Sequence, residues 1–133
     1  MRPPVPDRHR EPDVIQKVNV AEKLALFHEL WTPRIVAEVN DTQVKLAKVQ
    51  GELVWHSHAD EDELFLVLSG RLTLELRDGS VTLDPGEMVV IPRGVEHLPV
   101  ALEETHILLI ERSGIRHTGD VVEARTVAGY EWL

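Results

Sequence analysis

Two histidines and four acidic residues lie together near the middle of the chain, and their spacing could serve metal binding. His56 and His58 are one residue apart, and residues 60–63 are all Asp or Glu. Side chains at i and i+2 share a face on a strand, whereas on a helix they point nearly opposite ways. Two converging neutral imidazoles and a carboxylate are suitable ligands for a divalent transition metal. Since the chain has seven histidines, such a pair also arises by chance, and the pair alone is a weak signal.

The elements that would position these side chains are short strands. Runs of four to six residues, rich in apolar side chains, follow one another, with turn signals such as Asp78-Gly79 and Asp84-Pro85-Gly86 between them. The runs span residues 34–39, 44–49, 52–57, 63–68, 71–76, 80–83, 87–91 and 105–110. Eight short strands at regular spacing, with no helical segment between them, favour an all-β fold: an antiparallel sandwich or a small barrel.

The two ends of the chain differ from this pattern. Asn19 and Glu22 resemble a helix-capping box, and apolar residues at helical spacing follow, so we predict a helix over residues 20–31 that ends before Pro33. Residues 1–18 read as an irregular arm. Apolar residues between positions 121 and 133 predict a tail that packs against the domain. We expect the three tryptophans to be core or interface residues.

Composition excludes several classes of function. The chain of 133 residues has no cysteine, so disulfides, thiolate zinc sites and cysteine nucleophiles are excluded, and a reducing compartment such as the cytoplasm is favoured. The N-terminal segment lacks the apolar region of a signal peptide, and the longest apolar run is far too short to cross a membrane. A net charge of −9 would repel nucleic acid. We therefore predict a cytoplasmic protein that binds neither membranes nor nucleic acid.

Two motifs around the histidine pair resemble those of the cupin superfamily. Residues 51–70 read G-x4-H-x-H-x4-E-x6-G, and residues 86–97 read G-x5-P-x-G-x2-H. The first motif has one residue fewer before its histidine than the family pattern, and Ala101 stands where the second motif usually has asparagine. The resemblance implies a double-stranded β-helix, a jelly-roll barrel, as a small single-domain member. It also implies a metal site whose ligands are His56, His58, Glu63 and His97.

Two residues remain as alternatives. Counting back six residues from Gly70 reaches Glu63, which the family pattern supports, but Asp62 would be the ligand if the turn were one residue shorter. Asp60 and Glu61 are expected to be solvated turn residues. No catalytic residue can be assigned, and His106 is a weak candidate for a base, since a histidine at the start of a strand is more often a surface residue.

Three imidazoles and one carboxylate leave two open positions on an octahedral ion, which suits iron, manganese, nickel, copper or, with fewer ligands, zinc. This openness favours an enzyme acting on a small oxygen-rich molecule. Dioxygenase-type chemistry at a 3-His/1-Glu site ranks slightly first, because it needs no positioned base. Lewis-acid isomerase or lyase chemistry, similar to that of sugar isomerases, and a non-catalytic cupin that binds a small ligand are the alternatives.

The predicted domain organisation is simple. Residues 19–133 form one cupin domain, in which the first motif spans residues 51–70 and the second spans residues 86–101. A small barrel leaves sheet edges and outer faces to cover, and the predicted helix and tail lie outside the barrel strands. We therefore expect a homodimer.

Overall fold

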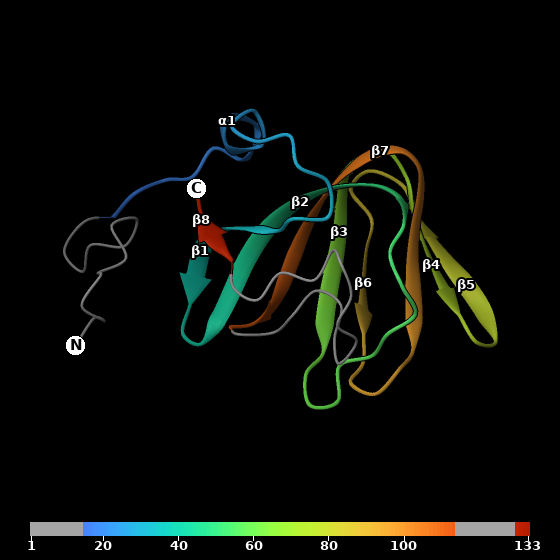
Figure 1. Ribbon diagram of the computed structural model, residues 1–133. Coiled ribbons are helices and arrows are strands. Elements are labelled where there is room, and N and C mark those ends of the chain that lie inside the picture. Colours follow the sequence, from blue (N-terminus) through green and yellow to red (C-terminus); the bar gives the residue numbers. More distant parts are fainter. Residues whose placement is uncertain (1–14, 114–129) are drawn as a thin grey trace.

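The computed structural model describes residues 15–113 and 130–133, and its elements are one short helix and eight strands (Figure 1). They are α1 (Val20–Leu24), β1 (Arg34–Val39), β2 (Thr42–Glu52), β3 (Glu63–Ser69), β4 (Leu72–Leu76), β5 (Gly79–Leu83), β6 (Met88–Ile91), β7 (His97–Arg112) and β8 (Glu131–Trp132).

The strands form a jelly-roll barrel organised around β7. One part of β7 pairs with β4, another part pairs with β3, and β2 runs antiparallel to β7 along most of its length. β5 extends the sheet beyond β4, β6 extends it beyond β3, and β1 lies beside β2. Figure 1 shows β7 (orange) bending over the top of the molecule, which brings β3 and β4 to its two arms. The predicted all-β jelly-roll fold is confirmed.

Two predicted strands differ from the observed ones. Residues 105–110 belong to the 16-residue β7, which starts already at His97. Residues 52–57 are no separate strand, because β2 ends at Glu52 and only a bond from Leu53 N–H to the Pro99 carbonyl and an isolated bridge from His56 to His97 follow. Proline has no N–H to return a hydrogen bond, which interrupts the ladder at this point.

The helix is shorter than predicted. Asn19 caps it by accepting the Glu22 N–H at 3.0 Å, as expected, but α1 ends at Leu24. The chain then follows β2: the Phe27 carbonyl accepts a hydrogen bond from Lys48 Nζ at 2.7 Å, and the Trp31 N–H donates to the Lys48 carbonyl at 2.8 Å. These tertiary contacts outweigh the local helical pattern of residues 25–31.

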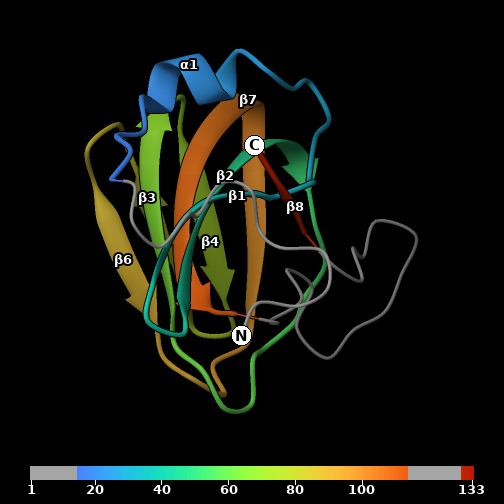
Figure 2. The ribbon, with the colours of Figure 1, turned by 90° about the vertical axis from the view of Figure 1, so that its left-hand side faces the viewer.

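The interior of the barrel and its outer surface have separate apolar clusters. Along β3, Glu63, Phe65 and Val67 are all buried and share the inner face, as the alternation of a regular strand predicts. On the outer face, Phe27, Val36 and Leu46 are covered by side chains from α1 and by Leu133. Figure 2 shows α1 lying across one end of the barrel. The inner cluster is the one that surrounds the candidate site.

The C-terminal end of the chain packs on the domain where it is described. β8 pairs parallel with β1, and the Leu133 N–H donates to the Ile35 carbonyl at 3.0 Å. Most of the predicted apolar tail and of the N-terminal arm lies outside the described residues. Within residues 15–113 and 130–133, no helix is long and apolar enough to cross a membrane. The domain limits and the homodimer stay predictions.

Candidate metal centre

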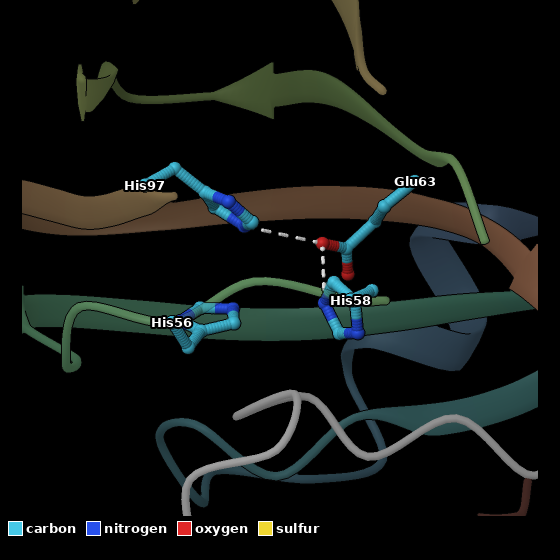
Figure 3. Close-up of side chains that lie close together, drawn as sticks. All are labelled: His56, His58, Glu63 and His97. Carbon is cyan, nitrogen blue, oxygen red and sulfur yellow. Dashed lines mark ion pairs between the residues drawn. The ribbon is translucent and has the colours of Figure 1, made fainter. Parts of the chain in front are cut away.

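The four residues that the motifs single out converge at one point inside the barrel. One potential ligand atom from each of His56, His58, Glu63 and His97 lies within 4.8 Å of those of the others, and all four residues are buried. Figure 3 shows the three imidazoles and the carboxylate pointing toward one another. The structure therefore contains a group of four residues that could hold a metal ion.

Different parts of the fold contribute these side chains. Glu63 is the first residue of β3, and His97 is the first residue of β7. His56 and His97 exchange two backbone hydrogen bonds, of 3.1 and 2.9 Å, in an isolated antiparallel bridge. The carbonyl of His58 accepts the Gly94 N–H at 2.8 Å, where Gly94 has a φ of 80°. That left-handed turn lies between the two motifs' histidines in space, and it suits glycine.

Glu63 is the centre of the group. Its Oε1 lies 3.1 Å from Nε2 of His58 and 3.5 Å from Nε2 of His97. Neither contact has the alignment of a hydrogen bond, since these three buried atoms, together with Nε2 of His56, have no hydrogen-bond partner in the described part of the chain. Buried polar atoms are nearly always paired, so four unpaired atoms at one point indicate a missing partner.

Backbone contacts orient two of the imidazoles. Nδ1 of His56 lies 2.8 Å from the Val54 carbonyl oxygen, and Nδ1 of His97 lies 3.0 Å from the Val95 carbonyl oxygen. A carbonyl oxygen can only accept, so Nδ1 must carry the proton in both rings. Nε2 of each neutral ring then presents its lone pair to the centre of the group. This arrangement is the usual support for a metal-binding histidine.

The geometry of the group fits one divalent ion. An ion about 2.1 Å from each ligand holds ligand atoms up to about 4.2 Å apart. The observed limit of 4.8 Å is slightly wider, so a contraction of a few tenths of an ångström would close the ligand set. A cation would also satisfy all four unpaired atoms.

The protonation states suit metal binding as well. Burial, followed by the nearby charge of His97, lowers the pKa of His56 to about 4, so its imidazole is neutral at pH 7. Burial would raise the pKa of Glu63, but the close contacts with His58 and His97 outweigh burial and hold the pKa of this carboxyl well below its usual range. An ionised carboxylate and a neutral imidazole are the forms that bind metals.

A buried ion pair next to the group was not predicted from the sequence. Lys45 Nζ lies 2.9 Å from Oε1 of Glu111, and both side chains are fully buried. The ammonium also lies 3.8 Å from the centre of the Tyr130 ring. Burial and the charge of Glu63 raise the pKa of Glu111 well above its usual value, while Lys45 opposes that shift. β3 and β7 place the two carboxyl groups side by side, because Leu64 pairs with Ile110.

The other candidate residues lie outside the group. Asp62 accepts a hydrogen bond from the Arg93 N–H at 2.9 Å at the surface, so the structure places Glu63 rather than Asp62 among the histidines. His106 contacts Glu104, with 2.7 Å between Nε2 and Oε2. It precedes Ile107, which faces the interior, so the structure does not bring His106 to the group. Asp60 is exposed, and Glu61 is partly buried, with its carboxylate 3.5 Å from Arg112.

A pocket adjoins the group and enters the barrel interior. It contains about 350 Å³ of space not filled by atoms, including the part open to solvent. His56 and Glu63 form its polar end. The remaining described residues that line it are apolar or aromatic: Trp31, Pro33, Ala47, Val49, Leu53, Phe65, Pro99, Ile107 and Leu109. Apart from the two potential ligands, no ionisable residue among the described ones lines this pocket.

Comparisons with known proteins agree with the fold and the motifs. The family model described as the cupin domain matches residues 43–111. The uncharacterised protein YdbB of Bacillus subtilis is 39% identical over 77 residues, which cover 57% of this chain and 68% of that protein.

Two solved structures are also similar. A cupin-2 domain-containing protein from Shewanella frigidimarina matches with 54% identity and a TM-score of 0.71, over 71% of this chain and 93% of the other. Protein NMB1881 from Neisseria meningitidis matches with 32% identity and a TM-score of 0.68, over 74% of this chain and 100% of the other.

Proposed function

We propose that this chain, which belongs to the cupin family, binds one divalent transition metal at His56, His58, Glu63 and His97 and acts there on a small oxygen-rich molecule. The observation that carries the proposal is the set of four buried ligand atoms without hydrogen-bond partners in the described residues. A closed structural site would need no adjoining space, whereas this group borders a pocket. Access of this kind favours a role in binding or chemistry over a purely structural one.

Among the reaction classes, dioxygenase-type chemistry has the best support. When bound, a divalent metal in this site would supply Lewis acidity and, if it is a redox metal, reactivity toward dioxygen. The protein's own residues would orient the substrate, exclude water and hold the ligands in their deprotonated forms. Isomerase and lyase reactions additionally require a positioned base. The described pocket residues offer none beyond the potential ligands, since His106 lies on the opposite face of β7 from Ile107.

Proton transfer marks the difference between the two enzymatic readings. A base must lie within about 3 Å of the proton that it removes, or one water further away. Lys45 and Glu111 are ionisable and near Glu63, but both are fully buried and bonded to each other. They do not line the described pocket, so a substrate there would not meet them. Lewis-acid isomerase or lyase chemistry therefore ranks second, and a non-catalytic binding protein is the remaining alternative.

The test combines metal loading with oxygen uptake. Metal-free protein would be loaded separately with iron(II), manganese(II), nickel(II) or zinc(II) and given a panel of small enols and diols, with and without dioxygen. We expect turnover only with redox metals and only with oxygen. Turnover with zinc under nitrogen would support the isomerase or lyase reading instead. Substrates that bind at the metal and never react would leave the binding-protein reading.

A further inference from the structure

The pocket beside the candidate metal group is polar at one end and apolar elsewhere. His56 and Glu63 form the polar end, and nine of the eleven lining residues are aliphatic, aromatic or proline. Phe65 and Val49, on the facing strands β3 and β2, are 4% and 1% exposed, so little solvent reaches these walls. A ligand whose oxygen atoms reach the metal group would place the rest of its body against this apolar surface.

The polar atoms of the walls are already engaged. The Trp31 indole N–H donates to the Gln50 carbonyl at 2.9 Å. The Pro99 carbonyl accepts the Leu53 N–H at 3.0 Å, and proline has no N–H of its own. Ala47 and Ile107 are partners in the β2–β7 ladder. The described part of the pocket therefore offers a ligand hydroxyl no evident hydrogen-bond partner beyond the metal group.

This composition discriminates between classes of ligand. A hydroxyl group that leaves water without finding a new partner weakens binding by about tenfold or more. A sugar-like molecule carries several hydroxyls, and the metal would take up only two of its oxygens. A short alkyl chain or a planar ring would instead gain from burial against Phe65 and the aliphatic residues. The walls thus favour an apolar body and disfavour a polyhydroxylated one.

Trp31 stands out among the wall residues because of its backbone. Its φ of 58° lies in the left-handed region, which a bulky residue rarely adopts. Two hydrogen bonds hold it there, from its N–H to the Lys48 carbonyl at 2.8 Å and from its indole to the Gln50 carbonyl. With 8% exposure, the ring is fixed in the wall of the pocket. A strained conformation retained at a ligand pocket indicates that the position of this ring matters.

From these observations we infer that the ligand of this site has an oxygen head that chelates the metal and a compact apolar body, and that Trp31 determines specificity for that body. The inference rests on the proposed metal site, and it narrows the substrate class from oxygen-rich molecules in general to those with an alkyl or aromatic body. Sugar-like substrates are thereby disfavoured.

A pair of chelating probes tests the inference directly. Butyrohydroxamate and 3-hydroxypropanohydroxamate share the same metal-binding head and differ in a terminal methyl against a hydroxyl. Cobalt(II)-loaded protein would report binding through its visible spectrum, and calorimetry would give each Kd. We expect butyrohydroxamate to bind about tenfold or more tightly than its hydroxyl analogue.

The possible failures are distinct. If the protein takes up no cobalt, the proposed metal site fails, and the inference falls with it. If cobalt binds and both probes then perturb its spectrum with equal affinity, or the hydroxyl analogue binds more tightly, the inference alone is overturned. Cobalt binding with no response to either probe also overturns it, because the pocket would then not hold a body of this size beside the metal.

Variants assign the preference to this wall. Trp31→Phe should keep the bound cobalt and weaken butyrohydroxamate binding several-fold, whereas Trp55→Phe should not, because Trp55 lies outside the described pocket lining and stacks with Arg77 at 3.8 Å. Equal Kd values for both variants would exclude Trp31 as a specificity residue.

A second pair of variants covers the case in which Trp31→Phe does not fold. Val49→Thr places a hydroxyl in the wall at nearly constant volume, and Val36→Thr makes the same change in the separate outer cluster. Val49→Thr should reduce the preference for the methyl probe several-fold while Val36→Thr leaves it unchanged. Unchanged preference in both variants would contradict the inference.

Discussion

Two buried polar clusters lie side by side in the barrel and differ in how their charges are satisfied. Lys45 and Glu111 bond to each other, with Nζ and Oε1 2.9 Å apart. In the metal group, Oε1 of Glu63 and the Nε2 atoms of three histidines meet without a hydrogen-bond partner among the described residues. The first cluster is complete within the protein, whereas the second needs a cation. The difference separates a pair that supports the fold from a group that binds a ligand.

The largest expected effect is loss of the metal from the second cluster. His97→Ala removes one of the four ligands and should weaken metal binding by more than about 100-fold, since even partners of ligands contribute up to about that factor. His106→Ala is the matched control, because His106 lies outside the group. Metal content after dialysis, measured by mass spectrometry, distinguishes the variants. A folded His97→Ala protein that keeps a full equivalent of metal would be inconsistent with the assigned site.

The first cluster should respond in stability rather than in metal content. Lys45→Met leaves Glu111 buried without its partner and should lower the free energy of unfolding by about 3 kcal/mol. Adding Glu111→Leu removes the second polar group and should recover most of that loss, because an apolar pair can replace a buried ion pair. Urea denaturation of the single and double variants measures both effects. A double variant no more stable than Lys45→Met would contradict this interpretation.

A smaller effect concerns the pH dependence of the metal-free protein. The pKa of His56 is about 4 in the fold and about 6.5 in an unfolded chain. Between these values the unfolded chain binds a proton that folded His56 does not, so stability falls as the pH falls through this window. We expect His56→Asn to remove about 2 kcal/mol of the loss between pH 7 and pH 4.5. The exposed His28 provides the control His28→Asn, which should keep the wild-type slope.

The smallest effect separates the two neighbouring acids. Glu63→Gln removes the anionic ligand and should weaken metal binding while the fold is retained. Asp62→Asn alters a surface contact with Arg93 and should change stability by less than about 0.5 kcal/mol, with metal content unchanged. Titration with a competing chelator measures both affinities. Equal affinities in the two variants would mean that Glu63 is not a ligand.

The sequence was sufficient for the fold class and for the group of four residues, because the cupin motifs record the ligand spacing directly. It was insufficient where pairing over long distances decides. Lys45 and Glu111 are 66 residues apart, and only the register of β2 and β7 brings them together. The helical pattern of residues 25–31 was misleading because contacts with Lys48 outweigh it. The start of β7 was missed because Pro99 and two adjacent acids resemble a turn.

The most direct test of the metal centre is the metal content of the wild-type protein itself. Protein purified without chelators, and protein incubated with iron, manganese, nickel, copper or zinc and then dialysed, would be analysed by mass spectrometry. The four converging ligand atoms predict about one equivalent of a divalent transition metal per chain. A folded protein that retains none of these metals under any loading condition would contradict the assignment.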